Sequence, residues 1–408
     1  MKDKIKNKVL SPFLYFFRSE SSSGIILLIC AVAAIVIANS DFAEVYEHIL
    51  HTEVAIGYGD YSLSMSILHW INDGLMAIFF LVVGMEIKRE VVFGELKSFK
   101  KTILPISAAI GGMIVPAIIY ALFNYNEPTI TGWGIPMATD IAFALGILSL
   151  VAKNAPKGIV VFLTALAIVD DLGAIIVIAV FYNSQISWLA LAMGLIVFIA
   201  LLLANKLKVK YISIYIILGL ILWVCLLKSG IHATIAGVLL GMILPIGENI
   251  HKFKNSILYK LEHTLTPWSS FAIMPIFAFA NAGITINADS FSSNIFSPAC
   301  LGIIFGLFIG KQIGIFGTSY ILVKLKIAKF PSSVTKRHLY GASVLGGIGF
   351  TMSIFVSSLS FADTTILSMA KMSIMIASIL AAIYGTIVFK VIKIKGRKYK
   401  LFVDKGII

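Results

Sequence analysis

Charged residues are scarce in this sequence. Only 13% of its 408 residues are Asp, Glu, Lys or Arg, whereas 59% are hydrophobic. Soluble domains are about a quarter charged, so this composition excludes a soluble globular protein. Apolar stretches of about 18–25 residues recur from end to end, and each is long enough to cross a hydrocarbon core of ~30 Å. We therefore expect an all-α integral membrane protein that forms one transmembrane domain over 1–408.

Cysteine and histidine are also few, and their placement excludes the common catalytic and metal sites. Cys30, Cys225 and Cys300 lie in or beside apolar segments without metal-type spacing, so we expect neither a disulfide nor a zinc site. The seven histidines are scattered, and no HExxH or CxxC motif occurs. Because no nucleophile–base pair is evident either, we expect neither an enzyme nor a bound cofactor.

Acidic residues are outnumbered by basic ones, and the basic excess indicates the orientation of the chain. When the N-terminus is placed inside, 30 of the 33 Lys and Arg residues fall in cytoplasmic segments. This bias predicts that both termini are cytoplasmic. The net charge of +13 therefore reflects the orientation of the chain in the membrane, and we expect no nucleic-acid partner. The twelve predicted spans are 23–40, 67–87, 103–123, 130–150, 158–182, 187–204, 211–227, 231–247, 269–286, 298–322, 339–361 and 366–389.

Among the outer loops between these spans, only the first is long. Apolar residues alternate along 53–66 on either side of Gly59-Asp60, which is the pattern of a β-hairpin with an Asp-containing turn. An irregular loop remains an alternative. Because an isolated two-stranded hairpin is only marginally stable, we expect this one to pair with a second copy of the chain.

Few ionisable side chains interrupt the spans, and four of them lie near mid-span: Asp140, Asp170, Asp171 and Lys311. A fifth, Asp73, lies in the second span. A charge at a helix centre costs about 2.5–3.5 kcal/mol on insertion, so it usually faces protein or water and serves a pathway. Alternatively, Asp170 only pairs with Lys311 to stabilise packing. That leaves Asp140 and Asp171 without partners, and a desolvated ion pair gains little.

The neighbouring carboxylates Asp170 and Asp171 suit an exchange of ions. Hard cations such as Na⁺ and Li⁺ take oxygen ligands, and a carboxylate offers either an oxygen ligand or a proton acceptor. Burial and a neighbouring like charge favour protonation of one member of such a pair. The pair is therefore predicted to hold either a cation or protons.

Two spans carry residues that break helices. Gly134 and Pro136 precede Thr139 and Asp140, and 341–355 contains four glycines within nine residues. Close packing through small residues is the alternative for the second span. The interrupted spans are the fourth and the eleventh, and each is the middle one of three helices (helices 3–5 and helices 10–12). This arrangement predicts an inverted-topology repeat in which the two interruptions cross at mid-membrane. We expect Asp140 to offset the N-terminal helix ends there and Lys311 the C-terminal ends.

Long ordered motifs make the chain similar to the NhaA-type bacterial Na⁺/H⁺ antiporters from about residue 12 to 390. They are MATDIAFALGILSL, LTALAIVDDLGAI, GIHATIAGVLLGM, LEHTLTPWSSFAIMPIFAFANAG, GLFIGKQIGI and GIGFTMSIF. The resemblance implies an electrogenic inner-membrane antiporter that expels Na⁺ or Li⁺ in exchange for periplasmic H⁺ and is active at alkaline pH. We also expect a homodimer embedded in membrane lipid, with the hairpin on the periplasmic side. The implied bundles are a core, about 103–182 and 298–389, and an interface bundle, about 23–87 and 187–286.

The same resemblance implies a role for each mid-span residue. Asp171 would be the principal ligand of Na⁺ or Li⁺, with Asp170 beside it. Thr139 and Asp140 match the residues at the unwound helix. Lys311 matches a lysine that pairs with Asp170 and takes part in proton coupling.

Activation at alkaline pH is attributed in this family to a charged cluster at the cytoplasmic entrance. The matching residues here are Glu86, Arg89, Glu90, Glu262 and His263. Charges at a helix end are often simply solvated, which is the alternative. Thr266 stands where the best-known pattern has a second histidine, and His232 is expected to be a packed, hydrogen-bonded residue rather than a sensor.

Two other classes remain as alternatives to exchange. A Na⁺-coupled symporter needs a pocket for an organic solute, and a channel needs a selectivity filter, but the chain offers only the buried acids, Thr139 and Lys311. A membrane enzyme would need a catalytic pair or a metal-type cluster.

Overall fold

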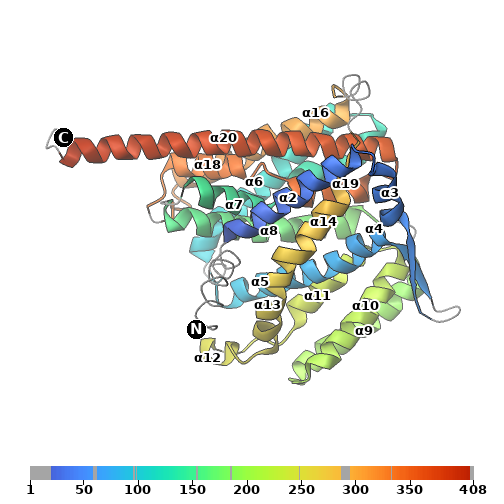
Figure 1. The fold of residues 1–408 in the computed structure, drawn as a ribbon. Helices are drawn as coiled ribbons and strands as arrows, with labels where there is room; N and C mark the ends of the chain where they lie inside the picture. Colours follow the sequence, from blue (N-terminus) through green and yellow to red (C-terminus); the bar gives the residue numbers. More distant parts are fainter. Residues whose placement is uncertain are drawn as a thin grey trace, which may run out of the picture.

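The computed structural model describes residues 20–57, 62–94, 97, 99–152, 155–183, 186–247, 249–285, 295–331 and 333–404. Within these ranges the chain is helical apart from one two-stranded sheet (Figure 1). Seven of the described helices are long and apolar enough to cross a membrane, and three pairs that meet at a bend raise the number to as many as ten. The expectation of an all-α, multi-span membrane protein is confirmed, while the count of twelve spans stays a prediction.

The first half of the chain supplies the hairpin and five long helices. Its elements are α2 (Glu20–Ala38), α3 (Ala43–His51), β1 (Glu53–Ile56), β2 (Leu63–Ser66), α4 (Ile67–His69), η2 (Trp70–Leu75), α5 (Met76–Val92), α6 (Phe99–Phe123), η4 (Pro128–Met137), α7 (Ile141–Val151), α8 (Lys157–Phe181) and α9 (Trp188–Lys206).

The second half ends in the long helix α20, which runs along one edge of the molecule in Figure 1. Its elements are α10 (Ile212–Ser229), α11 (Thr234–Ile243), α12 (Ile250–Phe253), α13 (Ile257–Trp268), η5 (Ser269–Ile273), α14 (Met274–Asn281), α16 (Pro298–Phe305), η6 (Gly306–Gly310), η7 (Gln312–Phe316), α17 (Gly317–Lys324), α18 (Lys336–Leu345), α19 (Phe350–Ser360) and α20 (Thr364–Asp404).

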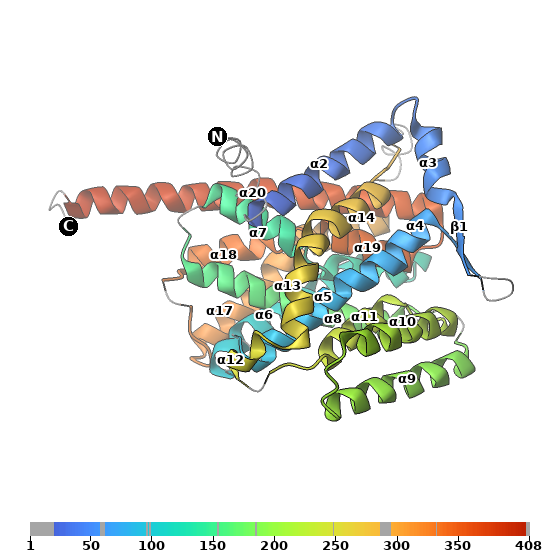
Figure 2. The same cartoon turned by 60° about the horizontal axis from the view of Figure 1, so that its bottom comes forward.

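The hairpin strands pair as the alternating pattern predicts. Val54 lies opposite Met65 and Ile56 opposite Leu63 in an antiparallel register. The indole N–H of Trp70 donates to the carbonyl of Val54 at 3.0 Å, which ties β1 to the start of η2. The strands project beyond the helices (Figure 2). The predicted turn at 59–60 lies outside the described residues.

Small residues let the helices approach closely. Gly314 of η7 lies so near α6 that a Cβ on it would collide with the carbonyl of Gly111. Such contacts are typical of membrane bundles, in which helix association relies on packing rather than on the expulsion of water. They bring the segment that contains Lys311 against α6.

The buried apolar side chains form two clusters. The smaller one joins α5 to α9, α10, α11 and α13 through residues such as Met85, Leu201 and Tyr215. The larger one holds most other helices together. Figure 1 shows α9 and α10 side by side at the edge of the molecule. Many large apolar side chains on α9 and α10, among them Leu189 and Ile196, are exposed, as expected of a surface that faces lipid.

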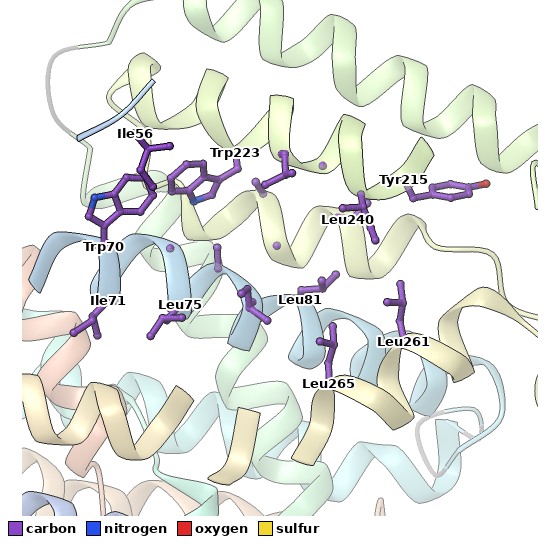
Figure 3. A pocket seen from close by; sticks show the side chains of 18 of the residues that line it. Ile56, Trp70, Ile71, Leu75, Leu81, Tyr215, Trp223, Leu240, Leu261 and Leu265 are labelled. Carbon is purple, nitrogen blue, oxygen red and sulfur yellow. The ribbon is translucent and has the colours of Figure 1, made fainter. Parts of the chain in front are cut away.

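A cavity of about 650 Å³ lies between α5, α10, α11 and α13 (Figure 3). Trp70 and Trp223 stack at one end, with ring centroids 6.0 Å apart, and Leu261 and Leu265 lie toward the other. Its lining contains no charged residue. The cavity is therefore separate from the mid-span acids.

Both predicted interruptions are present. The 3₁₀ helix η4 and α7 meet at a bend of 43°, and α18 and α19 meet at a bend of 44°. Pro136 contributes to the first break because it lacks a backbone N–H donor. The glycines at 346, 347 and 349 occupy the second break.

Candidate functional site

The two interruptions meet in space and complete each other's hydrogen bonds. The backbone N–H of Asp140 donates to the carbonyl of Ile348 at 2.7 Å. The Thr139 hydroxyl donates to the carbonyl of Gly346 at 3.0 Å. Helix ends leave backbone groups unpaired, and these need partners when they are buried. The hydrogen bonds between the two interruptions supply some of those partners.

Asp140 binds the N-terminal ends of two half-helices at once. One carboxylate oxygen, Oδ1, accepts from the N–H of Phe143 at 3.0 Å and so caps α7. The other oxygen accepts the backbone N–H of Thr351 at 3.2 Å, and also its hydroxyl. A carboxylate is stabilised at a helix N-terminus by the helix dipole and the free N–H groups. The position expected for Asp140 is confirmed.

Thr351 was not identified as a site residue from the sequence. Its only signal is a hydroxyl in the first turn after the glycine-rich break. Ser353 is similar: its hydroxyl donates to the carbonyl of Ile135 at 2.9 Å and ties α19 to η4. A threonine or serine within an apolar helix ordinarily bonds its own backbone, so these long-range contacts were not predictable.

Lys311 and Asp170 form an ion pair within the bundle. The lysine Nζ lies 2.7 Å from Oδ2 of Asp170, and the two side chains are 0% and 1% exposed. Lys311 stands between the π-helical segments η6 and η7, and such segments often occur at functional sites. Among the described residues, Lys311 donates no hydrogen bond to a helix C-terminal carbonyl. Its expected role at those ends therefore lacks a direct contact.

Asp171 differs from its neighbour in having no partner among the residues that the structure describes. Its carboxylate is buried at 7% exposure and makes no hydrogen bond or ion pair with the described residues. The charges of Asp170, Asp140 and Glu86 repel it, while Lys311 attracts it. Since consecutive helical side chains point about 100° apart, Asp170 faces Lys311 and leaves Asp171 facing elsewhere. Asp171 thus keeps its oxygen lone pairs available for a cation or a proton.

The carboxylate oxygens of Asp170 and Asp171 are suitable ligands for a small hard cation. The Asp171 carboxylate is unpaired, and Oδ1 of Asp170 is buried without a hydrogen-bond partner among the described residues. Within the same ranges no group of three His, Cys, Asp or Glu residues could hold a resident metal ion. The donor set suits Na⁺ or Li⁺ as a transported substrate.

Four of the five residues expected to sense pH lie together. Arg89 of α5 forms ion pairs with Glu86 at 3.5 Å, with Glu90 at 3.1 Å and with Glu262 of α13. His263 is exposed, packs at a tilt against Tyr259 with ring centroids 5.8 Å apart, and joins no ion pair in the described part of the chain.

The remaining predicted positions fall outside the site. Thr266 donates its hydroxyl to the backbone carbonyl of Glu262 at 2.7 Å. His232 is half-buried and hydrogen-bonds to the backbone of Tyr182, as expected of a packed residue. Asp73 is buried and pairs with His69 at 2.9 Å.

Comparison with known proteins gives one consistent result. A family described as Na⁺/H⁺ antiporter 1 matches residues 15–389. The Na⁺/H⁺ antiporter NhaA 2 of Clostridium beijerinckii is 85% identical over 398 residues, which covers 98% of each chain. The antiporter NhaA 1 of the same organism is 74% identical and covers 98% of this chain and all of its own. The Na⁺/H⁺ antiporter NhaA of Vibrio cholerae is 50% identical over 91% of this chain and 95% of its own.

Proposed function

The chain belongs to the Na⁺/H⁺ antiporter 1 family, and we propose that it exchanges Na⁺ for H⁺ at the Asp170–Asp171 pair. The assignment of the ion-binding site rests on the buried carboxylate of Asp171, which has no partner among the described residues and lies beside the Asp170–Lys311 ion pair. Na⁺ or Li⁺ takes carboxylate oxygens as ligands, and a proton removes the same lone pairs. The two substrates therefore exclude each other.

The crossing of the interrupted helices gives this exchange its geometry. Asp140 and Thr139 hold the two breaks together and bring further oxygens close to mid-span. In the arrangement we propose, twelve spans include inverted repeats at helices 3–5 and 10–12. The core bundle, 103–182 and 298–389, moves against the interface bundle, 23–87 and 187–286. Rocking of one bundle against the other opens the site to each side in turn.

The direction of transport follows from the proton gradient. We propose a bacterial inner-membrane exporter that has both termini in the cytoplasm and is driven by protons that enter from the periplasm. The site contains two carboxyl groups and one lysine amine, so the proton carriers are either the two aspartates or Asp170 with Lys311. More than one proton can therefore return for each Na⁺, which makes the exchange electrogenic.

Two regulatory features belong to the same proposal. The ion-pair cluster of Arg89 with Glu86, Glu90 and Glu262 links α5 to α13 at the cytoplasmic end, and its protonation loosens that link at low pH. The hairpin β1–β2 extends beyond the helices on the periplasmic side, where its free edges can pair with a second copy in a homodimer.

A symporter for an organic solute has no support in the site. The cavity between α5, α10, α11 and α13 contains no charged lining residue and is lined by none of the mid-span acids. This cavity therefore brings no charged group and no mid-span acid into contact with a solute.

Everted membrane vesicles from cells that lack their own sodium exchangers test the proposal. After respiration acidifies the lumen, NaCl, LiCl or KCl is added at several pH values while a ΔpH dye is followed. We expect proton efflux with Na⁺ and Li⁺ but not with K⁺, strongest at alkaline pH, and none with Asp171→Asn. Efflux from the asparagine variant would overturn the site assignment, and absence of efflux from the folded wild type would overturn the exchange itself.

A further inference from the structure

A polar side chain next to Lys311 joins three helices of the bundle. Gln312 lies near the centre of the candidate span Pro298–Lys324. Its Oε1 accepts a hydrogen bond from the Tyr340 hydroxyl at 2.9 Å, and its Nε2 donates to the carbonyl of Phe308 at 2.6 Å. The Tyr340 hydroxyl also lies 3.2 Å from that of Tyr384 on α20.

The two tyrosines pack against aromatic rings of the segment that carries Gln312. Tyr340 packs edge-on against Phe316, with centroids 5.5 Å apart, and Tyr384 packs edge-on against Phe308 at 6.0 Å. An amide at mid-span is expensive unless both of its polar ends are satisfied. Here both ends are bonded, one to α18 and the other to the carbonyl of its own preceding turn. The amide therefore has a fixed direction.

A hydrogen-bonded side chain such as Gln312 can fix the rotation of the helical segment that carries Lys311. The closest backbone approaches of this segment to α6 are at Gly310 and Gly314, and the side chains of Ile315 and Thr318 also lie against that helix. The π-helical segments on both sides of Lys311 depart from ordinary α-helical pairing. The lysine ammonium stands at the end of a flexible four-carbon stem, so its position depends on the backbone beneath it.

We infer that the Tyr340–Gln312 hydrogen bond positions Lys311 against Asp170 and couples that ion pair to the interrupted span of α18 and α19. Since successive helical side chains point about 100° apart, fixing Gln312 toward α18 directs Lys311 toward α8. Tyr340 lies on the half-helix that leads into the break beside Asp140. Tyr340 and Gln312 are positioning residues, because neither touches the acids.

This inference rests on the proposed exchange at Asp170 and Asp171. A shift of α18 during transport moves the Tyr340 hydroxyl, and with it the anchor of the lysine. Lys311 is not a cation ligand, so a misplaced ammonium slows the cycle while Na⁺ binding at Asp171 persists.

Transport by the purified full-length protein in proteoliposomes tests the inference. Tyr340→Phe keeps the ring and removes the hydroxyl. Tyr320→Phe is the matched control, because Tyr320 stacks on Phe316 and its hydroxyl makes no hydrogen bond with the described residues. We expect Tyr340→Phe to lower the turnover number about threefold, the factor for one interhelical hydrogen bond in a membrane. The KM for Na⁺ should stay unchanged, and Tyr320→Phe should match the wild type.

A double-mutant cycle with Lys311→Gln separates positioning from general packing. Distant, independent sites have additive effects. We expect Tyr340→Phe to lose its effect on turnover in the Lys311→Gln background. The same cycle is measured on the midpoint of thermal unfolding, which needs no activity, and non-additivity is expected there too. Additive effects in both measurements, or equal behaviour of Tyr340→Phe and Tyr320→Phe, would overturn the inference. Failure of the proposed function is separate, because it would appear in the wild type as absent Na⁺-driven proton movement.

Discussion

Lys311 and Asp170 are joined through one carboxylate oxygen only. Nζ lies 2.7 Å from Oδ2, whereas Oδ1 is buried without a hydrogen-bond partner among the described residues. The pair is therefore electrically balanced but incompletely satisfied. A buried pair of this kind contributes little net stability, yet removing one member leaves an isolated charge.

Replacing Lys311 alone should destabilise the protein more than replacing both partners. Lys311→Met leaves Asp170 buried and unpaired, so we expect a loss of about 3–5 kcal/mol in the free energy of unfolding. Adding Asp170→Leu should recover most of that loss. Denaturant unfolding in detergent measures both variants. A double variant less stable than Lys311→Met would contradict this description of the pair.

Thr351 should matter through its hydroxyl rather than its shape. Thr351→Val removes a hydrogen bond to the charged Asp140, which is worth about 1.5–3 kcal/mol. We expect a lower unfolding midpoint and a higher KM for Na⁺, because the crossing beside the site loosens. Thr351→Ser keeps the hydroxyl and serves as the matched control. A loss in Thr351→Ser as large as that in Thr351→Val would show that keeping the hydroxyl is not sufficient and would contradict this prediction.

The Arg89 cluster should control the acid side of the pH profile of exchange. Glu262→Gln removes one of the three carboxylates that bind Arg89, so we expect the profile to shift along the pH axis. His263→Gln changes the adjacent residue, which is exposed and forms no ion pair with the described residues, and should leave the profile in place. Dye-monitored exchange at a series of pH values measures both. A shift with His263→Gln alone would reverse the assignment.

Asp363 should make stability depend on acid pH. Its Oδ1 accepts the backbone N–H groups of Ile366 and Thr365 at the start of α20, and these hydrogen bonds lower the pKa of the carboxyl group. A lowered folded-state pKa gives stabilisation that is present above the ordinary pKa of aspartate and is lost as pH falls through the folded value.

We therefore expect the unfolding midpoint to drop on acidification from about pH 5 to about pH 2. Asp363→Asn accepts the same hydrogen bonds without titrating, so its midpoint should fall less. Identical pH dependence in the two proteins would refute the contribution of this carboxylate.

Much of the site was predictable because burying a charge in a membrane is costly. Asp140, Asp170, Asp171 and Lys311 stand out in apolar spans for that reason. Proline and glycine likewise indicated both interruptions, because each weakens a helix irrespective of its surroundings.

Other features depend on packing that no local pattern records. In the sequence Thr351 does not differ from other threonines in apolar helices. Its role appears only in the folded structure, where the two breaks meet at Asp140. His263 is adjacent to Glu262 in sequence, but one residue turns a helix by about 100° and separates their environments. The short helix α3 and the π-helical segments beside Lys311 were likewise not predicted, although Tyr46 and Leu50 of α3 are buried four residues apart, as a helical period requires.

The central claim is that Na⁺ and protons compete for the Asp171 carboxylate. Calorimetric titration of the purified protein with NaCl, in buffers of different ionisation enthalpy, measures the protons released per Na⁺ bound. The account predicts release of at least about one proton near neutral pH and no Na⁺ binding by folded Asp171→Asn. A binding enthalpy independent of the buffer, or unchanged proton release by the asparagine variant, would contradict it.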